Sequence, residues 1–161
     1  MRAAALAVLL AACGAATPAP AARISSVPVY AADATATDLA ALAAGRPLVI
    51  DFFASWCEAC RDNLAPMNAL AGEHAAGDIL VIGVAVGEDR AVADRYAARE
   101  GIRYPVYVDP EMRFEDSLGT SALPLVLVVD ESGHIAHRSP RLDAQALEVI
   151  RRLPARTARA R

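Results

Sequence analysis

Short runs of continuously apolar residues, separated by stretches with helical spacing, constrain the fold of this chain more than any other feature. A strand with one face in water alternates apolar and polar residues, whereas a strand covered on both faces is apolar throughout. The runs here show no such alternation, and they occupy residues 48–53, 79–86, 105–108 and 125–129. The sequence therefore predicts an α/β fold in which helices cover both faces of a central sheet.

The segments between these runs predict helices over 38–44, 57–71, 89–99, 111–118 and 143–153. Thr37 is expected to cap the first helix and Gly45 to close it. A turn signal at residues 130–133 predicts that 134–138 returns as an antiparallel hairpin strand, which makes the sheet mixed.

Composition limits the size of the fold and its partners. The chain has 161 residues, of which 55% are hydrophobic and 22% charged, so one domain with a substantial core is expected. A net charge of −3 argues against a nucleic-acid partner. No feature of the sequence indicates an oligomer, so we expect a monomer.

The N-terminal residues predict export. Arg2 is followed by an apolar run over residues 3–12, which is too short to span a bilayer but suits a signal peptide. This run ends at Cys13 in a sequence that looks like a bacterial lipobox, in which Cys13 would be lipidated and anchor the protein to a membrane. The alternative is an ordinary signal peptide cut near residues 19–21.

Three further segments complete the expected organisation. Residues 14–34 are rich in Ala, Pro, Ser and Thr and predict a flexible tether. The folded domain is expected over 35–153, and residues 154–161 form an arginine-rich tail that is best interpreted as a solvated C-terminus.

Cys57 and Cys60 carry the clearest chemical signal. They follow a buried strand and begin a predicted helix, whose N-terminal N–H groups and partial positive charge stabilise a thiolate. A spacing of three residues places Cys60 one turn from Cys57, so a disulfide can open and close between them. Cys57, at the exposed end, is the expected attacking thiol, and Cys60 would resolve the mixed disulfide.

Other uses of the cysteine pair stay open from the residues alone. A structural disulfide would close so small a loop that it adds only about 2 kcal/mol of stability. A zinc site needs four ligands, and only His74, His134 and His137 could complete it. The two thiols could also be buried and inert. If Cys13 is lipidated, the mature chain keeps two thiols, both in the motif, which favours a redox pair.

The segment 49–60, which contains Trp56-Cys57-Glu58-Ala59-Cys60, resembles the active-site segment of the thioredoxin superfamily. The run 81–88, followed by a predicted helix and residues 104–106, and the run 123–130 extend the resemblance over residues 35–153. The chain is most similar to the exported, membrane-tethered TlpA/ResA-like thiol:disulfide oxidoreductases linked to cytochrome c maturation. The resemblance implies a thioredoxin-like fold with a strand–helix insertion.

The resemblance also implies roles for single residues. Pro124 matches the cis-proline beside the dithiol, and Leu123 would contact the substrate; the alternative is a trans proline that starts a strand. Asp51 matches the buried aspartate that accepts a proton from the second cysteine, here Cys60, and its alternative is an aspartate that ends a strand. Trp56 is expected to shield the dithiol and, together with Glu58, to contact the substrate; the alternative for Trp56 is core packing.

The chain departs from the family pattern at several positions. Ala59 replaces the common proline of the motif, and Asn63 stands where some members have a functional glutamate. Glu58, beside the nucleophile, is expected to disfavour the thiolate. The proline that bends the active-site helix falls one place later, at Pro66. For Glu88, a solvated residue at the start of a helix is the favoured interpretation, and a place near the site is the alternative.

These observations predict an exported thiol:disulfide oxidoreductase that acts mainly as a reductase and needs no cofactor beyond its own disulfide. Its expected partners are disulfides in other exported proteins, apocytochrome c among them, and a membrane-embedded electron donor. Two alternatives remain: an oxidant that donates its disulfide, because the potential sets the direction, and a chaperone that holds Cu(I) through two thiolates.

Overall fold

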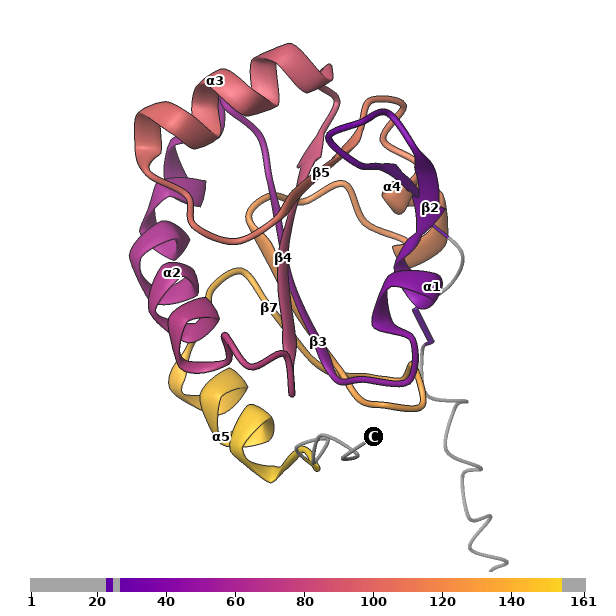
Figure 1. Ribbon diagram of the computed structural model, residues 1–161, viewed down its shortest axis with the longest axis vertical. Helices are drawn as coiled ribbons and strands as arrows, with labels where there is room; N and C mark the ends of the chain where they lie inside the picture. Colours follow the sequence, from indigo (N-terminus) through magenta and orange to yellow (C-terminus); the bar gives the residue numbers. More distant parts are fainter. Residues whose placement is uncertain (1–22, 25–26, 155–161) are drawn as a thin grey trace, which may run out of the picture.

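The computed structural model describes residues 23–24 and 27–154. A seven-stranded mixed sheet forms its centre, with the strand order β2-β1-β5-β4-β3-β6-β7 (Figure 1). The strands are β1 (Pro28–Tyr30), β2 (Ala36–Asp38), β3 (Leu48–Phe53), β4 (Leu80–Val86), β5 (Val106–Asp109), β6 (Leu125–Val129) and β7 (Ile135–Ser139). Strands β3, β4 and β6 are buried almost throughout, as their continuous apolar character predicts.

Helices cover both faces of this sheet (Figure 1). One face carries α2 (Leu64–Glu73), α3 (Arg90–Glu100) and α5 (Ala144–Arg152), and the other carries α1 (Leu39–Ala43) and α4 (Phe114–Leu118). The expected α/β fold with a central mixed sheet is confirmed, and α3 with β5 forms the expected strand–helix addition.

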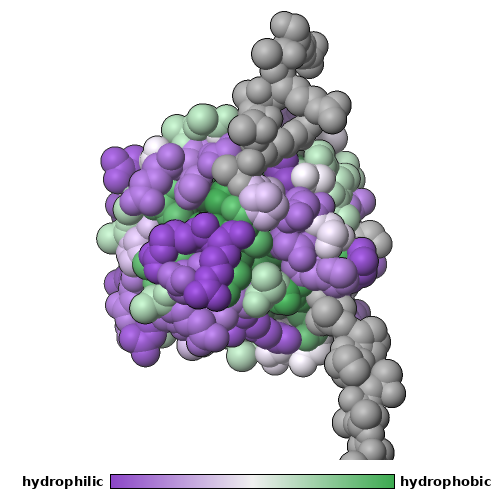
Figure 2. All heavy atoms as spheres, turned by 90° about the horizontal axis from the view of Figure 1, so that it is seen from below, coloured by the Kyte–Doolittle hydropathy of each residue, from purple (hydrophilic) through white to green (hydrophobic). Residues whose placement is uncertain are grey.

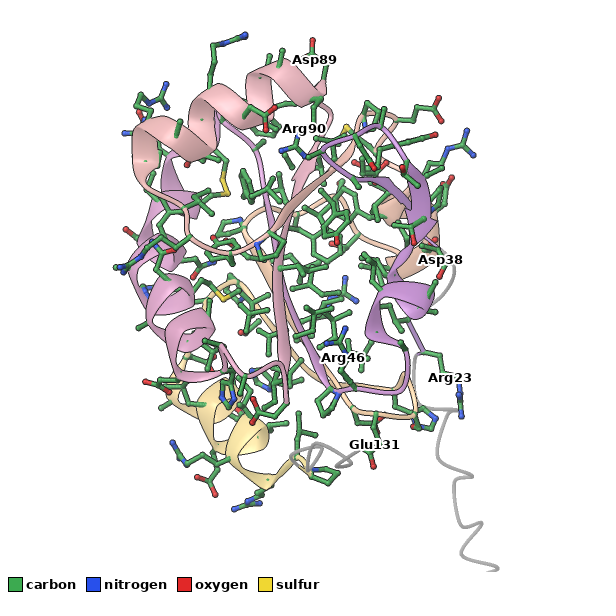
Figure 3. The ribbon with its side chains drawn as sticks, in the orientation of Figure 1. Arg23, Asp38, Arg46, Asp89, Arg90 and Glu131 are labelled. Carbon is green, nitrogen blue, oxygen red and sulfur yellow. A yellow bond between two sulfur atoms is a disulfide. The ribbon has the colours of Figure 1, made fainter. Side chains whose placement is uncertain are left out.

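Three of the helices are capped at the N-terminus by an aspartate side chain. Asp38, Asp89 and Asp143 each accept a hydrogen bond from the third backbone N–H beyond them, which satisfies a donor that the helix leaves free. Figure 3 shows Asp38 and Asp89 at the starts of α1 and α3. The expected cap at Thr37 is therefore wrong by one residue, because Thr37 lies in β2 and Asp38 supplies the carboxylate.

The predicted tether over 14–34 extends too far into the domain. Residues 28–30 form β1, which pairs with β2 and β5, and Val27 and Val29 are fully buried. Arg23 forms a bridge with His134 and donates to the carbonyl of Ser132, in the hairpin that carries Glu131 (Figure 3). Cys13 and the predicted signal peptide lie outside the described residues, as does most of the arginine-rich tail.

The predicted helix over 57–71 is two elements. Residues Glu58–Asn63 form a 3₁₀ helix, η1, and α2 begins at Leu64. Pro66 is the third residue of α2. The first four N–H groups of a helix have no acceptor within that helix, so the N–H that proline lacks costs α2 no hydrogen bond. The proline therefore neither ends nor interrupts α2.

The predicted helix over 111–118 is shorter in the structure, because α4 begins only at Phe114. The backbone N–H groups of Arg113 and Phe114 both donate to the Asp109 carboxylate.

The sheet topology brings distant segments to one edge. Strands β3, β4 and β5 are parallel, so their carboxyl ends share this edge, and β6 begins there because it runs antiparallel to β3. The opposite end of the sheet, where β3 begins, has a mainly hydrophilic surface with smaller hydrophobic areas (Figure 2). Within the described ranges, no helix is long and apolar enough to cross a bilayer.

Candidate functional site

Cys57 and Cys60 form a disulfide at the edge where β3 ends. A turn closed by the bond from the Cys57 N–H to the Ala54 carbonyl (3.0 Å) makes Cys57 the first flanking residue of η1. The two Cα atoms are 5.4 Å apart, within the ordinary range for a disulfide. Cys57 is 8% exposed and Cys60 is fully buried, so an incoming partner reaches Cys57 first.

Trp56 lies beside Cys57 and is 65% exposed, which makes it the one large apolar side chain with high exposure in the described residues. This exposure rules out the expected alternative of core packing. Glu58 is also exposed and is the acidic residue of the first turn of η1. An exposed indole at the rim of a reactive pair offers an apolar contact surface to a partner.

The Leu123–Pro124 peptide bond is cis, as the resemblance implied. Pro124 directly precedes β6, whose first residue, Leu125, pairs with Phe52 near the end of β3. Leu123 and Pro124 are half-buried. The cis-proline segment and the segment that leads to Cys57 therefore leave the same edge of the sheet side by side.

Asp51 is fully buried in β3 between Gly83 of β4 and Val126 of β6. Its carboxylate accepts a hydrogen bond from Asn63 Nδ2 at Oδ1 (3.3 Å) and one from the Tyr104 hydroxyl at Oδ2 (3.1 Å). Burial raises the pKa of Asp51 to about 7, and the two hydrogen bonds oppose this rise. Asp51 is therefore a buried carboxyl group that can exchange a proton near neutral pH.

Asn63 connects the redox segment to two other parts of the chain. Besides its bond to Asp51, its amide donates to the Pro140 carbonyl (3.2 Å), and its oxygen accepts from the Leu142 N–H (3.3 Å). Side chains three residues apart eclipse each other in a 3₁₀ helix. Cys60, one turn before Asn63 in η1, therefore lies on the side of this helix that faces Asp51.

Glu88 is buried rather than solvated, so its sequence-based interpretation is wrong. Only 8% of the residue is exposed, and its Oε1 accepts hydrogen bonds from the backbone N–H of Ser55 (2.9 Å) and from the Ser55 hydroxyl. Because Asp89, not Glu88, caps α3, Glu88 is free to turn back toward the loop that leads to Cys57. It holds that loop in place.

Glu88→Ala is expected to destabilise the oxidised protein by about 1–3 kcal/mol, because it leaves the part-buried Ser55 N–H without an acceptor. Glu88→Gln keeps an acceptor oxygen and should lose less. Urea unfolding, with the exposed Glu111→Ala variant as a control, measures the effect. A Glu88→Ala variant as stable as the control would contradict this anchoring role.

The histidines, considered above as zinc ligands, are paired with carboxylates instead. His74 contacts Asp78 at 3.1 Å, and His137 lies 3.4 Å from Asp143. His134 bonds to Ser132 and lies 3.7 Å from an Asp130 oxygen. In the part of the chain that the structure describes, no three His, Cys, Asp or Glu side chains are grouped to hold a metal ion.

A protein-family model described as Redoxin matches residues 14–145. The chain belongs to the Redoxin family. Thiol-disulfide oxidoreductase ResA of Geobacillus thermodenitrificans (strain NG80-2) is 25% identical to it over 91 residues, which is 56% of this chain and 52% of that protein. Thiol:disulfide interchange protein DsbE of Allochromatium vinosum is 32% identical over 103 residues, 63% of this chain and 55% of that protein. The chain thus spans about half the length of these relatives.

Solved structures show the same fold. A thiol:disulfide interchange protein of the thioredoxin family from Chlorobium tepidum TLS is 25% identical, with a TM-score of 0.65 over 84% of this chain and 97% of that one. A secreted thiol-disulfide isomerase from Corynebacterium glutamicum is 20% identical, with a TM-score of 0.67 over 78% and 81%. The expected thioredoxin-like fold is confirmed for this Redoxin family member.

The structure brings together most of the residues that the sequence singled out and adds one. The Cys57–Cys60 disulfide lies beyond the carboxyl end of β3, the strand that carries Asp51, and Pro124 directly precedes β6, which pairs with β3. Tyr104 entered the sequence analysis only as part of a motif, although its hydroxyl bonds to Asp51. The one sequence signal at this position is the Tyr-Pro pair before a short predicted strand. This pair does not indicate that the Tyr104 side chain reaches Asp51 on another strand.

Proposed function

We propose that this chain is a thiol:disulfide oxidoreductase in which Cys57 attacks a substrate disulfide and Cys60 resolves the product. The observation that carries the proposal is the reachable Cys57 joined to the fully buried Cys60 at the open edge of the sheet. Exposed Trp56 and the cis Leu123–Pro124 bond flank this edge and offer a surface for a substrate chain. The oxidoreductase relatives in the same family support this activity.

The reaction conserves electrons between the two dithiols. The Cys57 thiolate attacks one sulfur of the substrate disulfide, and the other substrate sulfur leaves as a thiolate that takes up a proton. The Cys60 thiol then loses its proton, attacks Cys57 and forms the intramolecular disulfide. The second substrate thiol is released, so the substrate gains two electrons and two protons. A reduced dithiol donor returns the protein to its starting state.

Asp51 accepts the proton from Cys60 in this proposal. It is buried on the side of η1 that Cys60 shares with Asn63, and its pKa of about 7 leaves a large fraction ionised at neutral pH. A base with a pKa near the working pH transfers protons most effectively. Because Cys60 is shielded from water, no bulk base reaches it easily.

The proposed setting is the extracytoplasmic side of a membrane. Relatives include a secreted isomerase and ResA-type and DsbE-type oxidoreductases, and the N-terminal sequence predicts export with lipidation at Cys13. Such compartments oxidise thiols, so a reductase there needs a membrane-embedded electron donor. Its substrates would be disulfides of exported proteins, and the resemblance favours apocytochrome c.

The reduction potential of the Cys57–Cys60 couple tests the proposed direction. We expect a value at or below roughly −230 mV, toward the thioredoxin end of the range, when the domain is equilibrated with defined dithiothreitol or glutathione ratios. Trp56 fluorescence follows the redox state. A value near −120 mV, typical of a strong oxidant, would overturn the reductase assignment. The absence of a reversible two-electron couple would overturn the enzymatic proposal itself.

A further inference from the structure

The carboxylate of Asp51 is held from two sides by different parts of the chain. Asn63 comes from η1, the helix of the cysteine pair, whereas Tyr104 comes from the loop before β5. In the sheet, β4 lies between β5 and β3. The Tyr104 side chain therefore crosses the width of β4 to reach Asp51, and this path needs free space above that strand.

Gly83 of β4 provides this space. It pairs with Asp51 in the parallel register of β3 and β4. A Cβ atom at Gly83 would lie 2.9 Å from Tyr104 Cε2 and 2.9 Å from Phe53 Cε1, closer than such atoms approach in proteins. The backbone N–H of Gly83 also donates to the Pro105 carbonyl (2.9 Å), which fixes the loop that carries Tyr104. The missing side chain at residue 83 is thus what lets the phenol reach β3.

We propose that Tyr104 is a positioning residue for the redox reaction: its hydroxyl, passing over Gly83, orients the Asp51 carboxylate and favours its ionised form. The inference rests on the proposed role of Asp51 as the proton acceptor for Cys60. The Tyr104 hydroxyl occupies Oδ2 and the Asn63 amide occupies Oδ1, so both oxygens have a fixed direction. A hydrogen bond to a carboxylate favours the charged state over the neutral acid.

Apart from Tyr104 and Asn63, the surroundings of Asp51 are mainly apolar. Helices α2 and α5 present apolar side chains to this face of the sheet. Besides Tyr104, the titratable group whose pKa the Asp51 carboxylate raises is Tyr96 of α3. None of the ion pairs found in the described ranges includes Asp51, so its charge depends on the two neutral donors.

Tyr104→Phe removes one hydroxyl and leaves the ring in place over Gly83. We expect the pKa of Asp51 to rise by about 1, because a hydrogen bond to a charged group is stronger than one to a neutral group. The ionised fraction at pH 7 then falls from about one half to about one tenth. The rate at which Cys60 resolves a mixed disulfide should therefore drop roughly 5-fold at pH 7 and recover above pH 9.

Two readouts test the proposal. Carbon NMR titration of the side-chain carboxyl groups in the oxidised full-length protein follows Asp51, with Asp51→Asn identifying its resonance. Stopped-flow measurement of mixed-disulfide resolution across pH 6–10 follows the reaction. Tyr107→Phe is the matched control, since it removes a phenol from β5 at a position whose register partner is Val84 rather than Gly83.

An Asp51 titration and a pH profile that shift in Tyr104→Phe but not in Tyr107→Phe support the inference. An unchanged Asp51 titration in Tyr104→Phe would overturn it and leave the proposed function standing. If Asp51→Asn resolves mixed disulfides at the normal rate, Asp51 is not the proton acceptor. The proposed mechanism then fails, and with it the role of Tyr104.

Discussion

Cys57→Ala is expected to abolish disulfide exchange, whereas Cys60→Ala is expected to keep the first chemical step and stop there. The two sulfurs differ in access: Cys57 is 8% exposed at the rim, and Cys60 is fully buried one turn further into η1. An incoming disulfide can meet the Cys57 thiolate, but it cannot approach Cys60 without opening the fold. Once Cys57 has formed a mixed disulfide with the substrate, that sulfur–sulfur bond is the one that the buried Cys60 thiol can reach.

Reduction of insulin disulfides with dithiothreitol as the electron source measures this difference. Both variants should turn over at the background rate of the reductant alone. In a single-turnover experiment, Cys60→Ala should still release one substrate thiol per protein, and Cys57→Ala should release none. Equal single-turnover release by the two variants would contradict the assignment of attacking and resolving thiols.

Asp51→Asn is expected to stabilise the fold at pH 8 while it slows catalysis. Burial places the pKa of Asp51 at about 7, against about 3.9 in an unfolded chain. Between these values the native state binds more protons than the unfolded state, so the wild-type protein loses stability as the pH rises from 4 to 7. The native and unfolded pKa of Asp51 differ by roughly three, which lowers the free energy of unfolding by on the order of 4 kcal/mol above pH 7. An asparagine is neutral at every pH and carries no such cost.

Urea unfolding of the oxidised protein at several pH values tests this linkage. The stability of Asp51→Asn relative to wild type should rise between pH 4 and pH 7 and then level off. Turnover at pH 7 should fall by about 100-fold, since general-base catalysis contributes at least about that factor. A stability difference that stays flat from pH 4 to pH 8 would contradict the raised pKa, and unchanged turnover would contradict the catalytic role.

The features that the sequence predicted are those that depend on short-range signals. The Cys57–Cys60 pair could be found because its chemistry depends on spacing within one turn. Pro124 could be found because the segment 123–130 resembles the thioredoxin superfamily, which implies a cis-proline at this position. The buried strands could be found because both of their faces are covered, which removes polar residues from them. These signals sufficed for the fold class and for the position of the redox pair.

The features that the sequence missed depend on contacts between distant segments. Tyr104 bonds to Asp51 across 53 residues, and this contact needs β5 to lie beside β4. Glu88 bonds to Ser55 across 33 residues and resembles an ordinary helix-start residue until the loop geometry is known. The sequence did not predict β1, because a strand of three residues flanked by Ala and Pro is too short to show a hydrophobic periodicity.

The most direct test of the central claim is to trap the mixed disulfide. Reduced Cys60→Ala, incubated with a disulfide-bonded peptide and then quenched with acid, is analysed by intact-mass and fragment-mass spectrometry under non-reducing conditions. The proposed mechanism predicts one covalent peptide adduct, located at Cys57, which dithiothreitol removes. The reduced Cys57→Ala variant, treated in the same way, should form none. An adduct on Cys60 of Cys57→Ala, with none on Cys57 of Cys60→Ala, would contradict the mechanism.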